Sequence, residues 1–348
     1  MTSTLVAALR AGLFVVLALA FCGLVFEIAG YSAVAMFQSI AEGAFLSQRA
    51  LMNSLRWTLP IFLMAAGVIV SFRAGFFNIG AQGQFYMGAI GGAFAAEWLA
   101  GYPAILVVPL VVIASIASGA LWALWPGILR VRFGTDEVIT TLMANFIATI
   151  LLSFVTSGPL KDPSGTGQSS SSRPVDAAYR LSDSAGLSPT IVIVVVVAGI
   201  AVWVLVNRTA FGLLSGLVGR NPVMMRWQGA NLQAIGLASF AVAGALAGLA
   251  ASLEFLGPNG RIVSGFLPAH GFTAVLVALV AGLSIGAAAF VSLFFGGLAA
   301  AALYLPVMAG LPAAAIAVIN AAIALFITAR STALTAWLGG FVKPVRGS

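Results

Sequence analysis

Charge is what this sequence has least of. Only 7% of the 348 residues are Asp, Glu, Lys or Arg, whereas 61% are hydrophobic and the mean hydropathy is +1.10. A soluble domain carries roughly 25% charged residues, so this chain has too few to cover a water-facing surface. Disordered chains are poor in apolar residues and are excluded. The composition predicts a polytopic helical membrane protein, because the apolar segments lack the alternation typical of barrel strands.

Reactive and metal-binding residues are also scarce. The chain has one cysteine, Cys22, one histidine, His270, and two lysines, Lys161 and Lys343. One cysteine forms no intrachain disulfide and no multi-cysteine metal site. Neither lysine follows a GxxxxGK[ST] loop, and GxSxG, HExxH and CxxC motifs are absent. The sequence therefore predicts no catalytic residue, no metal and no directly bound cofactor, and it does not predict an enzyme.

Ten apolar segments are long enough to be read as membrane spans, each needing about 20 mostly apolar residues. They lie near 11–33, 57–72, 83–100, 104–127, 137–157, 189–207, 233–253, 271–285, 287–308 and 312–330. The first is also open to interpretation as a signal peptide, although it is long and has no clear cleavage site. We expect an all-α bundle of about ten transmembrane helices that forms one domain over 1–348.

The basic residues predict the orientation of these spans. With both termini in the cytoplasm, ten of the 16 basic residues lie inside, and cytoplasmic loops are enriched in Lys and Arg. The inside set is Arg10, Arg73, Arg130, Arg132, Arg208, Arg220, Arg226, Arg330, Lys343 and Arg346. This distribution explains the net charge of +7 without a nucleic-acid partner. Membrane lipid is the expected surrounding.

Two hydrophilic segments interrupt the spans. Segment 158–188 is rich in Ser, Gly and Pro and is expected to be an external loop, either a plain connector or a docking surface. Segment 208–232 is expected on the cytoplasmic side. There Asn221 is a favoured N-cap, Pro222 suits the first helical position and Gly229 suits the left-handed position that ends a helix. This short helix either lies on lipid or docks a protein that transmits force.

Polar residues inside spans are costly and therefore suggest function. Thr141, Asn145, Thr149 and Ser153 recur every four residues in the fifth span and are expected to share one stripe. Such a stripe either lines a solute path or bonds helices together. Asp136 and Glu137 stand at its start, where acids favour a helix N-terminus. Glu27, in the first span, is a candidate proton or ion carrier.

A second unusual segment joins the second and third spans. Residues 73–84 carry three amides, Asn78, Gln82 and Gln84, together with three glycines. Glycine permits irregular backbone, which at membrane depth is tolerated only beside protein or water. We expect a broken or re-entrant segment near a solute path, with an ordinary cytoplasmic turn as the alternative. The pairs Gly88/Gly92 and Gly244/Gly248 have the GxxxG spacing of close helix packing.

Several of these segments together resemble one family. Residues 77–84 (FNIGAQGQ) resemble the FNIGAEGQ motif of bacterial ABC importer permeases in the branched-chain amino acid/simple-sugar superfamily, and 134–145 (GTDEVITTLMAN) are similar to the GxNEVIxTxMxN segment of its nucleoside-type branch. GPLKDP at 158–163, residues 219–229 and residues 264–273 match further family segments in the same order. Gln82 departs from the family, where Glu is common, and Thr135-Asp136 replaces the usual pair.

The resemblance implies a type II importer-like permease that carries a small neutral polar solute, most simply a nucleoside or nucleobase, across the bacterial inner membrane. Simple sugars and riboflavin remain alternatives, as does an ion-coupled secondary transporter using Glu27. It implies a cytoplasmic ABC ATPase that binds ATP, a second and related permease subunit, and an external substrate-binding protein. The implied path residues are Asn78, Gln82, Gln84, Thr141, Asn145 and Thr149. The implied ATPase-coupling residues are Gly219, Arg220, Asn221, Pro222, Arg226, Trp227 and Gly229.

Overall fold

The computed structural model describes residues 2–164, 170–181, 187–265, 269–312 and 314–326. Most of this part is helical, and its only β pairings are two isolated bridges, Lys161 with Ser172 and Ser171 with Val263. The expected all-α membrane bundle is confirmed. The contacts divide the chain into two compact units, 1–54 with 297–348 and 55–296.

The first unit holds helices from both ends of the chain. It comprises α1 (Thr2–Ile28), α2 (Ala33–Ala44), the start of α3 (Gln48–Arg73) and α13 (Leu305–Met308). The Ser32 hydroxyl caps α2 by accepting from the Ala35 N–H at 3.2 Å. The exposed Glu27 carboxylate accepts from the Ala33 N–H at 2.7 Å. Glu27 therefore shapes the turn between α1 and α2.

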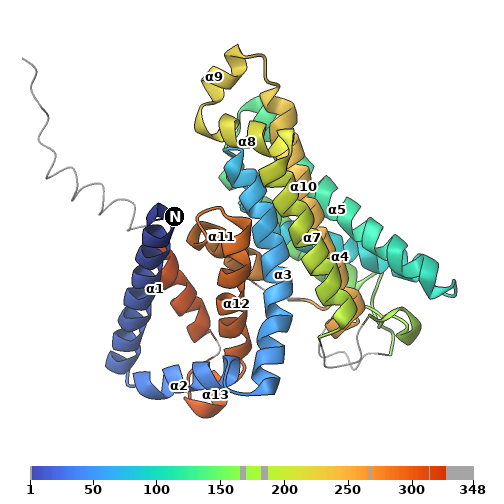
Figure 1. Ribbon diagram of the computed structural model, residues 1–348. Helices are drawn as coiled ribbons and strands as arrows, with labels where there is room; N and C mark the ends of the chain where they lie inside the picture. Colours follow the sequence, from blue (N-terminus) through green and yellow to red (C-terminus); the bar gives the residue numbers. More distant parts are fainter. Residues whose placement is uncertain (1, 165–169, 182–186, 266–268, 313, 327–348) are drawn as a thin grey trace, which may run out of the picture. The chain divides into compact units, whose positions relative to one another are not determined.

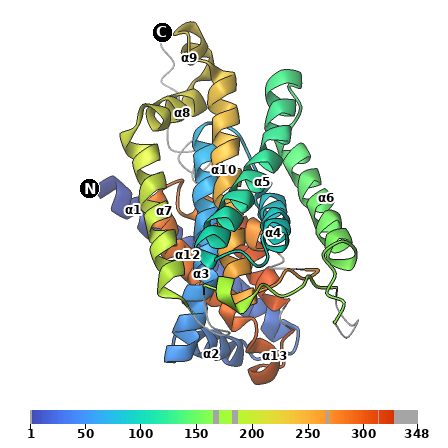
Figure 2. The same ribbon diagram turned by 90° about the vertical axis from the view of Figure 1, so that its right-hand side faces the viewer.

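The second unit contains the helices that carry the expected functional residues. After the rest of α3 come α4 (Ala81–Trp98), α5 (Ala104–Phe133), α6 (Glu137–Ser157), the 3₁₀ turn η1 (Ala177–Tyr179), α7 (Pro189–Arg208), α8 (Ala210–Arg220), α9 (Pro222–Trp227), α10 (Leu232–Glu254), the π-helical η2 (Phe255–Asn259), α11 (His270–Val280) and most of α12 (Ile285–Ala301). Figures 1 and 2 show α4, α5 and α10 packed side by side.

Small residues allow these three helices to touch through their backbones. A Cβ added to Gly88 of α4 would lie 2.6 Å from the Cα of Gly248 in α10, and one added to Gly119 of α5 would lie 3.0 Å from that same Cα. Any larger side chain would push the helices apart, since a Cβ does not approach a backbone atom this closely. The close packing predicted from the glycine pairs is thus present, and α4 is buried along most of its length.

Each of the ten expected spans corresponds to a helix, but the lengths differ. In the described part, five helices are long and apolar enough to cross a membrane: Gln48–Arg73, Ala104–Phe133, Glu137–Ser157, Pro189–Arg208 and Leu232–Asn259. The others are shorter or more polar. The span expected at 271–285 ends at Val280, and that at 287–308 breaks after Ala301. The tenth covers 315–326, and its last four expected residues lie outside the described part. Ten crossings therefore stays a prediction.

The two hydrophilic segments lie at opposite ends of the second unit. Figure 1 shows α8 and α9 at one end of α10, with the η1 segment at the other end. Between 158 and 181 the chain is fastened to the residues after α10, with the Val175 N–H donating to Gly260 C=O at 2.7 Å and the Leu181 N–H to Leu256 C=O at 2.8 Å. Residues 165–169 and 182–186 of the expected loop lie outside the described part.

Candidate functional site

The site begins where α3 ends. Gly75 has a positive φ of 81°, and its N–H donates to Phe72 C=O while the Phe76 N–H donates to Ser71 C=O at 3.0 Å. These two bonds form a Schellman motif, which satisfies the last carbonyls of the helix. Residues 76–80 then continue as irregular chain until α4 starts at Ala81. The expected break in the helical structure is therefore present.

One face of α6 holds this irregular segment by its backbone. Three side chains, spaced four residues apart, accept from backbone N–H groups of this segment and of the first turn of α4. Glu137 Oε1 accepts from Phe77 at 3.3 Å, Thr141 Oγ1 from Ile79 at 3.2 Å, and Asn145 Oδ1 from Gly83 at 2.8 Å. Asn145 Nδ2 also donates to Ile79 C=O at 2.9 Å. We call these contacts the α6 clamp.

The clamp places irregular backbone well inside the bundle. From Glu137 to Asn145 is about 12 Å along the helix axis, so the clamp contacts, which run from Phe77 to Gly83 in the first turn of α4, lie beside α6 over about that distance. Buried N–H and C=O groups without partners are expensive in a membrane, and the side chains of α6 supply those partners. The break that was predicted within residues 73–84 is therefore present and lies beside α6.

The three amide side chains of residues 73–84 lie within the same buried region. Asn78, Gln82 and Gln84 are each at most 3% exposed. Asn78 Oδ1 accepts from the Gly80 N–H at 2.9 Å and from Gln84 Nε2 at 3.0 Å, whereas Asn78 Nδ2 has no hydrogen-bond acceptor among the described residues. A buried donor without an acceptor is costly, and it is available to a bound solute or water.

Gln82 connects the clamp to a second helix that begins inside the bundle. Its Oε1 accepts from the Gly271 N–H at 2.6 Å, in the first turn of α11. A Cβ on Gly271 would collide with the Gln82 backbone. The starts of α4 and α11 are thus in direct contact. Helix N-termini carry partial positive charge and free N–H groups, and in transporters such interrupted helices line substrate sites.

The expected polar stripe on α6 is only partly correct. Residues four apart on a helix drift by about 40° per step, because each turn takes 3.6 residues. Thr141 and Asn145 consequently face the clamped segment, but Thr149 is exposed and donates only to Asn145 C=O, at 2.8 Å. Ser153 has turned further and lies 3.1 Å from the Ser264 hydroxyl. The structure brings together five of the six expected path residues and leaves Thr149 apart.

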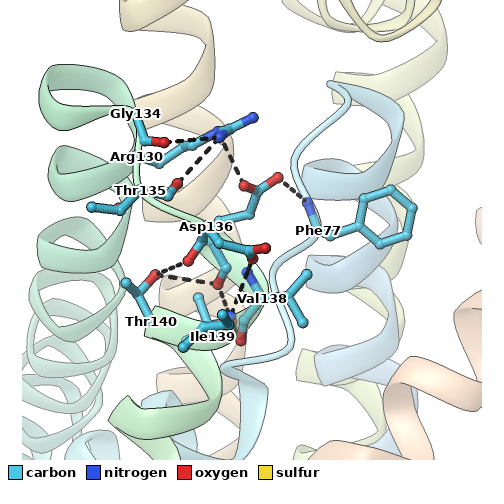
Figure 3. Close-up of polar contacts among 10 residues, drawn as sticks. Phe77, Arg130, Gly134, Thr135, Asp136, Val138, Ile139 and Thr140 are labelled. Atoms are coloured by element: carbon cyan, nitrogen blue, oxygen red, sulfur yellow. Dashed lines mark hydrogen bonds and ion pairs between the residues drawn. The ribbon is translucent and has the colours of Figure 1, made fainter.

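An ion pair closes the end of the clamp nearest to α8 (Figure 3). Arg130 Nε lies 3.0 Å from Glu137 Oε2, and Arg130 Nη1 donates to Thr135 C=O at 3.1 Å. Asp136 stands at the start of α6, as predicted, and its side chain caps the helix by accepting from the Val138 N–H at 2.8 Å. Arg130 and Glu137 were not predicted as a pair, although only residues 134–136 separate α5 from α6.

Segment 208–232 forms two short helices where the sequence predicted one. Asn221 Oδ1 accepts from the Met224 N–H at 2.9 Å, Pro222 is the first residue of α9, and Gly229 has a φ of 79°, so the predicted caps are confirmed. Trp227 is 87% exposed, and Arg220 and Arg226 are exposed beside it. Met225 alone in α9 is buried, against Ala74, Val218 and Ile235.

Gly219 brings this pair of helices against the end of α3. A Cβ added there would collide with Arg73 C=O and lie 3.0 Å from the Gly75 nitrogen. Gly75 is the residue that ends α3 and starts the irregular segment. The contact with Gly219 therefore lies only two residues before Phe77, the first residue held by the α6 clamp.

Together, the long apolar helices, the clamped break and the exposed capped helix are typical of a membrane transport protein. The family model described as branched-chain amino acid transport system, permease component, matches residues 50–329. The chain belongs to this family, and the resemblance found in its motifs is confirmed.

Curated relatives agree with this assignment. The chain is 33% identical to the glucose ABC transporter permease protein of Haloferax volcanii over 293 residues, which cover 81% of this chain and 76% of the relative. It is 30% identical to the guanosine ABC transporter permease protein of Bacillus subtilis, covering 90% of each, and 30% identical to the nucleoside ABC transporter permease protein of Lactococcus lactis, covering 86% and 85%. No solved structure matches the chain.

Proposed function

We propose that this chain is the permease subunit of an ATP-driven importer for a small neutral solute, with nucleosides or nucleobases as the preferred class. Two of the relatives named above are a guanosine and a nucleoside permease, and both match the chain over more than four fifths of its length. The site agrees with a neutral solute, because the proposed path residues are amides and hydroxyls, and the clamp carboxylate of Glu137 is paired with Arg130. These groups recognise hydrogen-bonding solutes without offering a net charge.

The observation that carries the ATP-driven part is the exposure of α9. A helix with Trp227, Val223 and Met224 pointing outward, and held by one buried side chain, is suited to insert into a partner protein. An apolar hollow of about 310 Å³ lies beside it, lined by Leu214, Met225, Ala234 and Ile235 among others. We propose that this surface binds the cytoplasmic ABC ATPase.

The solute path is proposed to run along the α6 clamp. In the present conformation Asn78, Gln82, Gln84, Thr141 and Asn145 bond one another or nearby backbone, so solute reaches them only if the segment and α6 separate. Closure of the ATPase would move α9 and α8, and the contact of Gly219 with the end of α3 would carry this motion to the segment. Alternating access of this kind exchanges protein hydrogen bonds for bonds to solute.

The proposed setting is the bacterial inner membrane, with both termini in the cytoplasm. Arg73, Arg130, Arg132 and Arg208 lie in the last turns of α3, α5 and α7, and Arg220 and Arg226 are in or beside the helices that we assign to the ATPase. This end of the second unit is the basic one, as expected for the cytoplasmic side. The opposite end would receive the substrate-binding protein, and a related second permease subunit would complete the path.

The test is a gentle detergent pull-down of the tagged chain from its native membrane, with partners identified by mass spectrometry. Recovery of a P-loop ATPase from the wild-type chain, and its loss from Trp227→Ala, supports the proposal. Phe133→Ala is the matched control, because Phe133 is an aromatic residue 72% exposed that lies outside α9. An intact complex without any ATPase would contradict the proposal and favour an ion-coupled carrier.

A sugar is the second candidate solute. The relative with 33% identity is a glucose permease, and a further relative at 24% identity is a galactofuranose permease from Escherichia coli. A probable riboflavin permease of Treponema pallidum is equally distant, at 24%. Glucose, galactofuranose, guanosine and riboflavin all carry several hydroxyl groups, so a polyhydroxylated solute is the feature common to these candidates. Competition of guanosine, glucose and riboflavin for uptake would separate them.

A further inference from the structure

A second polar cluster in the 55–296 unit is not accounted for by the clamp. At the end of α10, Glu254 is 4% exposed, and Arg56 Nη2 of α3 lies 3.6 Å from its Oε2. Asn259 Nδ2 donates to the same oxygen at 2.6 Å. The Arg56 guanidinium lies over the Trp57 ring, 4.8 Å from its centroid, and that ring lies 4.9 Å from the imidazole of His270.

Burial of the Glu254 carboxylate at this position costs free energy. A buried carboxylate loses its hydration, and at the C-terminus of a helix it also faces the negative end of the helix dipole. Apolar residues of similar size often replace buried ion pairs without loss of stability. The partners of Glu254 also fit poorly, because the Arg56 contact is long and the buried Arg56 Nε–H has no acceptor among the described residues. Packing alone does not explain such a group.

The cluster is partly exposed around the buried Glu254 and adjoins the clamp. Arg56, Trp57, Asn259 and His270 are each partly exposed. α10 is interrupted here, with Gly257 in a non-helical conformation and Pro258 following. His270 precedes Gly271, whose N–H bonds Gln82. Polar groups therefore continue from Glu254 through His270 to the amides of the clamp.

We infer that Arg56, Trp57, Glu254, Asn259 and His270 form a recognition site for the sugar hydroxyls of the solute. A carboxylate accepts two adjacent hydroxyls, while Arg56 Nε–H and the Asn259 amide supply donors to their oxygens. The Trp57 ring lies under the Arg56 guanidinium and positions it for this contact. The inference rests on the proposed function and specifies which part of the solute this site binds.

The experiment compares guanosine with 2′,3′-dideoxyguanosine, which lacks the paired hydroxyls, as solutes for ATP-dependent uptake by the reconstituted complex. Sites that bond a substrate hydroxyl discriminate strongly against the analogue without it. We expect the wild-type complex to prefer guanosine at least about 10-fold, and Glu254→Gln to lower guanosine uptake efficiency about 10-fold while changing the dideoxy analogue less than about 2-fold. Glu97→Gln, which alters the ion pair of Glu97 with Arg173 elsewhere in the unit, is the matched control and should spare both solutes.

Asn259→Ala guards against a folding defect, because it leaves the Arg56–Glu254 pair in place. It should also reduce the preference for guanosine, about 3-fold. Equal losses for the two solutes in either variant, or a wild-type complex that does not distinguish them, would overturn the inference and make the cluster a structural tie. If the complex carries glucose instead, the same comparison uses glucose and 2-deoxyglucose. A complex that takes up neither solute with ATP contradicts the proposed function itself.

Discussion

Asn145 and Gly83 join α6 to the start of α4 by a hydrogen bond of 2.8 Å, from the Gly83 N–H to Asn145 Oδ1. The same side chain donates to Ile79 C=O at 2.9 Å. One amide thus satisfies a donor on one side of the helix break and an acceptor on the other. Neither aspartate nor leucine has both groups, so the position requires an amide.

Asn145→Leu removes both bonds and leaves two backbone groups buried without partners. Each such group costs about 1–3 kcal/mol, so the free energy of unfolding should fall by that order. Uptake should be lost as well, because the proposed path runs through this contact. The measurements are thermal unfolding in detergent and solute uptake at matched membrane levels. Thr149→Val is the control, since Thr149 is exposed. Full uptake by Asn145→Leu would remove Asn145 from the path.

Gly219→Ala tests the contact between α8 and the end of α3. The added methyl group would collide with Arg73 C=O, and overpacking of this kind costs about 1–3 kcal/mol. We expect more ATP to be hydrolysed for each solute molecule carried. Gly216→Ala is the matched control in the same helix, because its Cβ has no neighbour nearer than 3.9 Å. If the two variants show the same ratio of hydrolysis to uptake, motion does not pass through Gly219.

Two residues of α9 should separate stability from partner binding. Trp227→Ala changes an exposed ring and should leave the unfolding temperature of the isolated permease unchanged while weakening ATPase binding at least about 10-fold. Met225→Ala empties a buried position and should lower stability by about 2–5 kcal/mol. Unfolding in detergent and co-purification of the ATPase give the two readouts. Normal ATPase binding by Trp227→Ala would place the partner elsewhere.

Asp162 fastens the loop after α6 and sets its response to acid. Hydrogen bonds from the Ser164 hydroxyl at 2.6 Å and from the Ser164 N–H at 2.9 Å lower the pKa of this carboxyl below its usual 3.8. A lowered folded-state pKa contributes stability above the unfolded value that is lost as pH falls through the folded one. Limited proteolysis of residues 158–181 should therefore be constant from pH 7 to pH 5. Ser164→Ala removes the hydroxyl bond and should increase cleavage at both pH values; an unchanged rate would show that the hydroxyl bond does not hold the loop.

Local chemistry was predictable from the sequence, and long-range pairing was not. The helix ends at Asn221 and Gly229 follow from side chains and glycine conformations within a few residues, and both are present. Helix α8 was missed because it has only 11 residues and includes three glycines, which lower helix propensity. The bond of Gln82 to Gly271 spans 189 residues, and no local pattern encodes it.

The polar residues of α6 show the same difference between predictable and unpredictable features within one helix. Their spacing correctly indicated that Thr141 and Asn145 share a face, but the drift of the four-residue repeat turns Thr149 away. The pairing of Arg56 with Glu254 joins two helices almost 200 residues apart, and it was not anticipated. Residue types therefore predicted which groups matter, while the packing of the helices decided which of them meet.

The most direct test of the central claim is uptake of labelled guanosine, and separately of labelled glucose, into vesicles containing the purified permease with its co-purified partners. The account predicts uptake of at least one solute that requires ATP on the α9 side and survives a proton uncoupler. Uptake that stops with the uncoupler and continues without ATP would contradict it, and would make the chain an ion-coupled carrier.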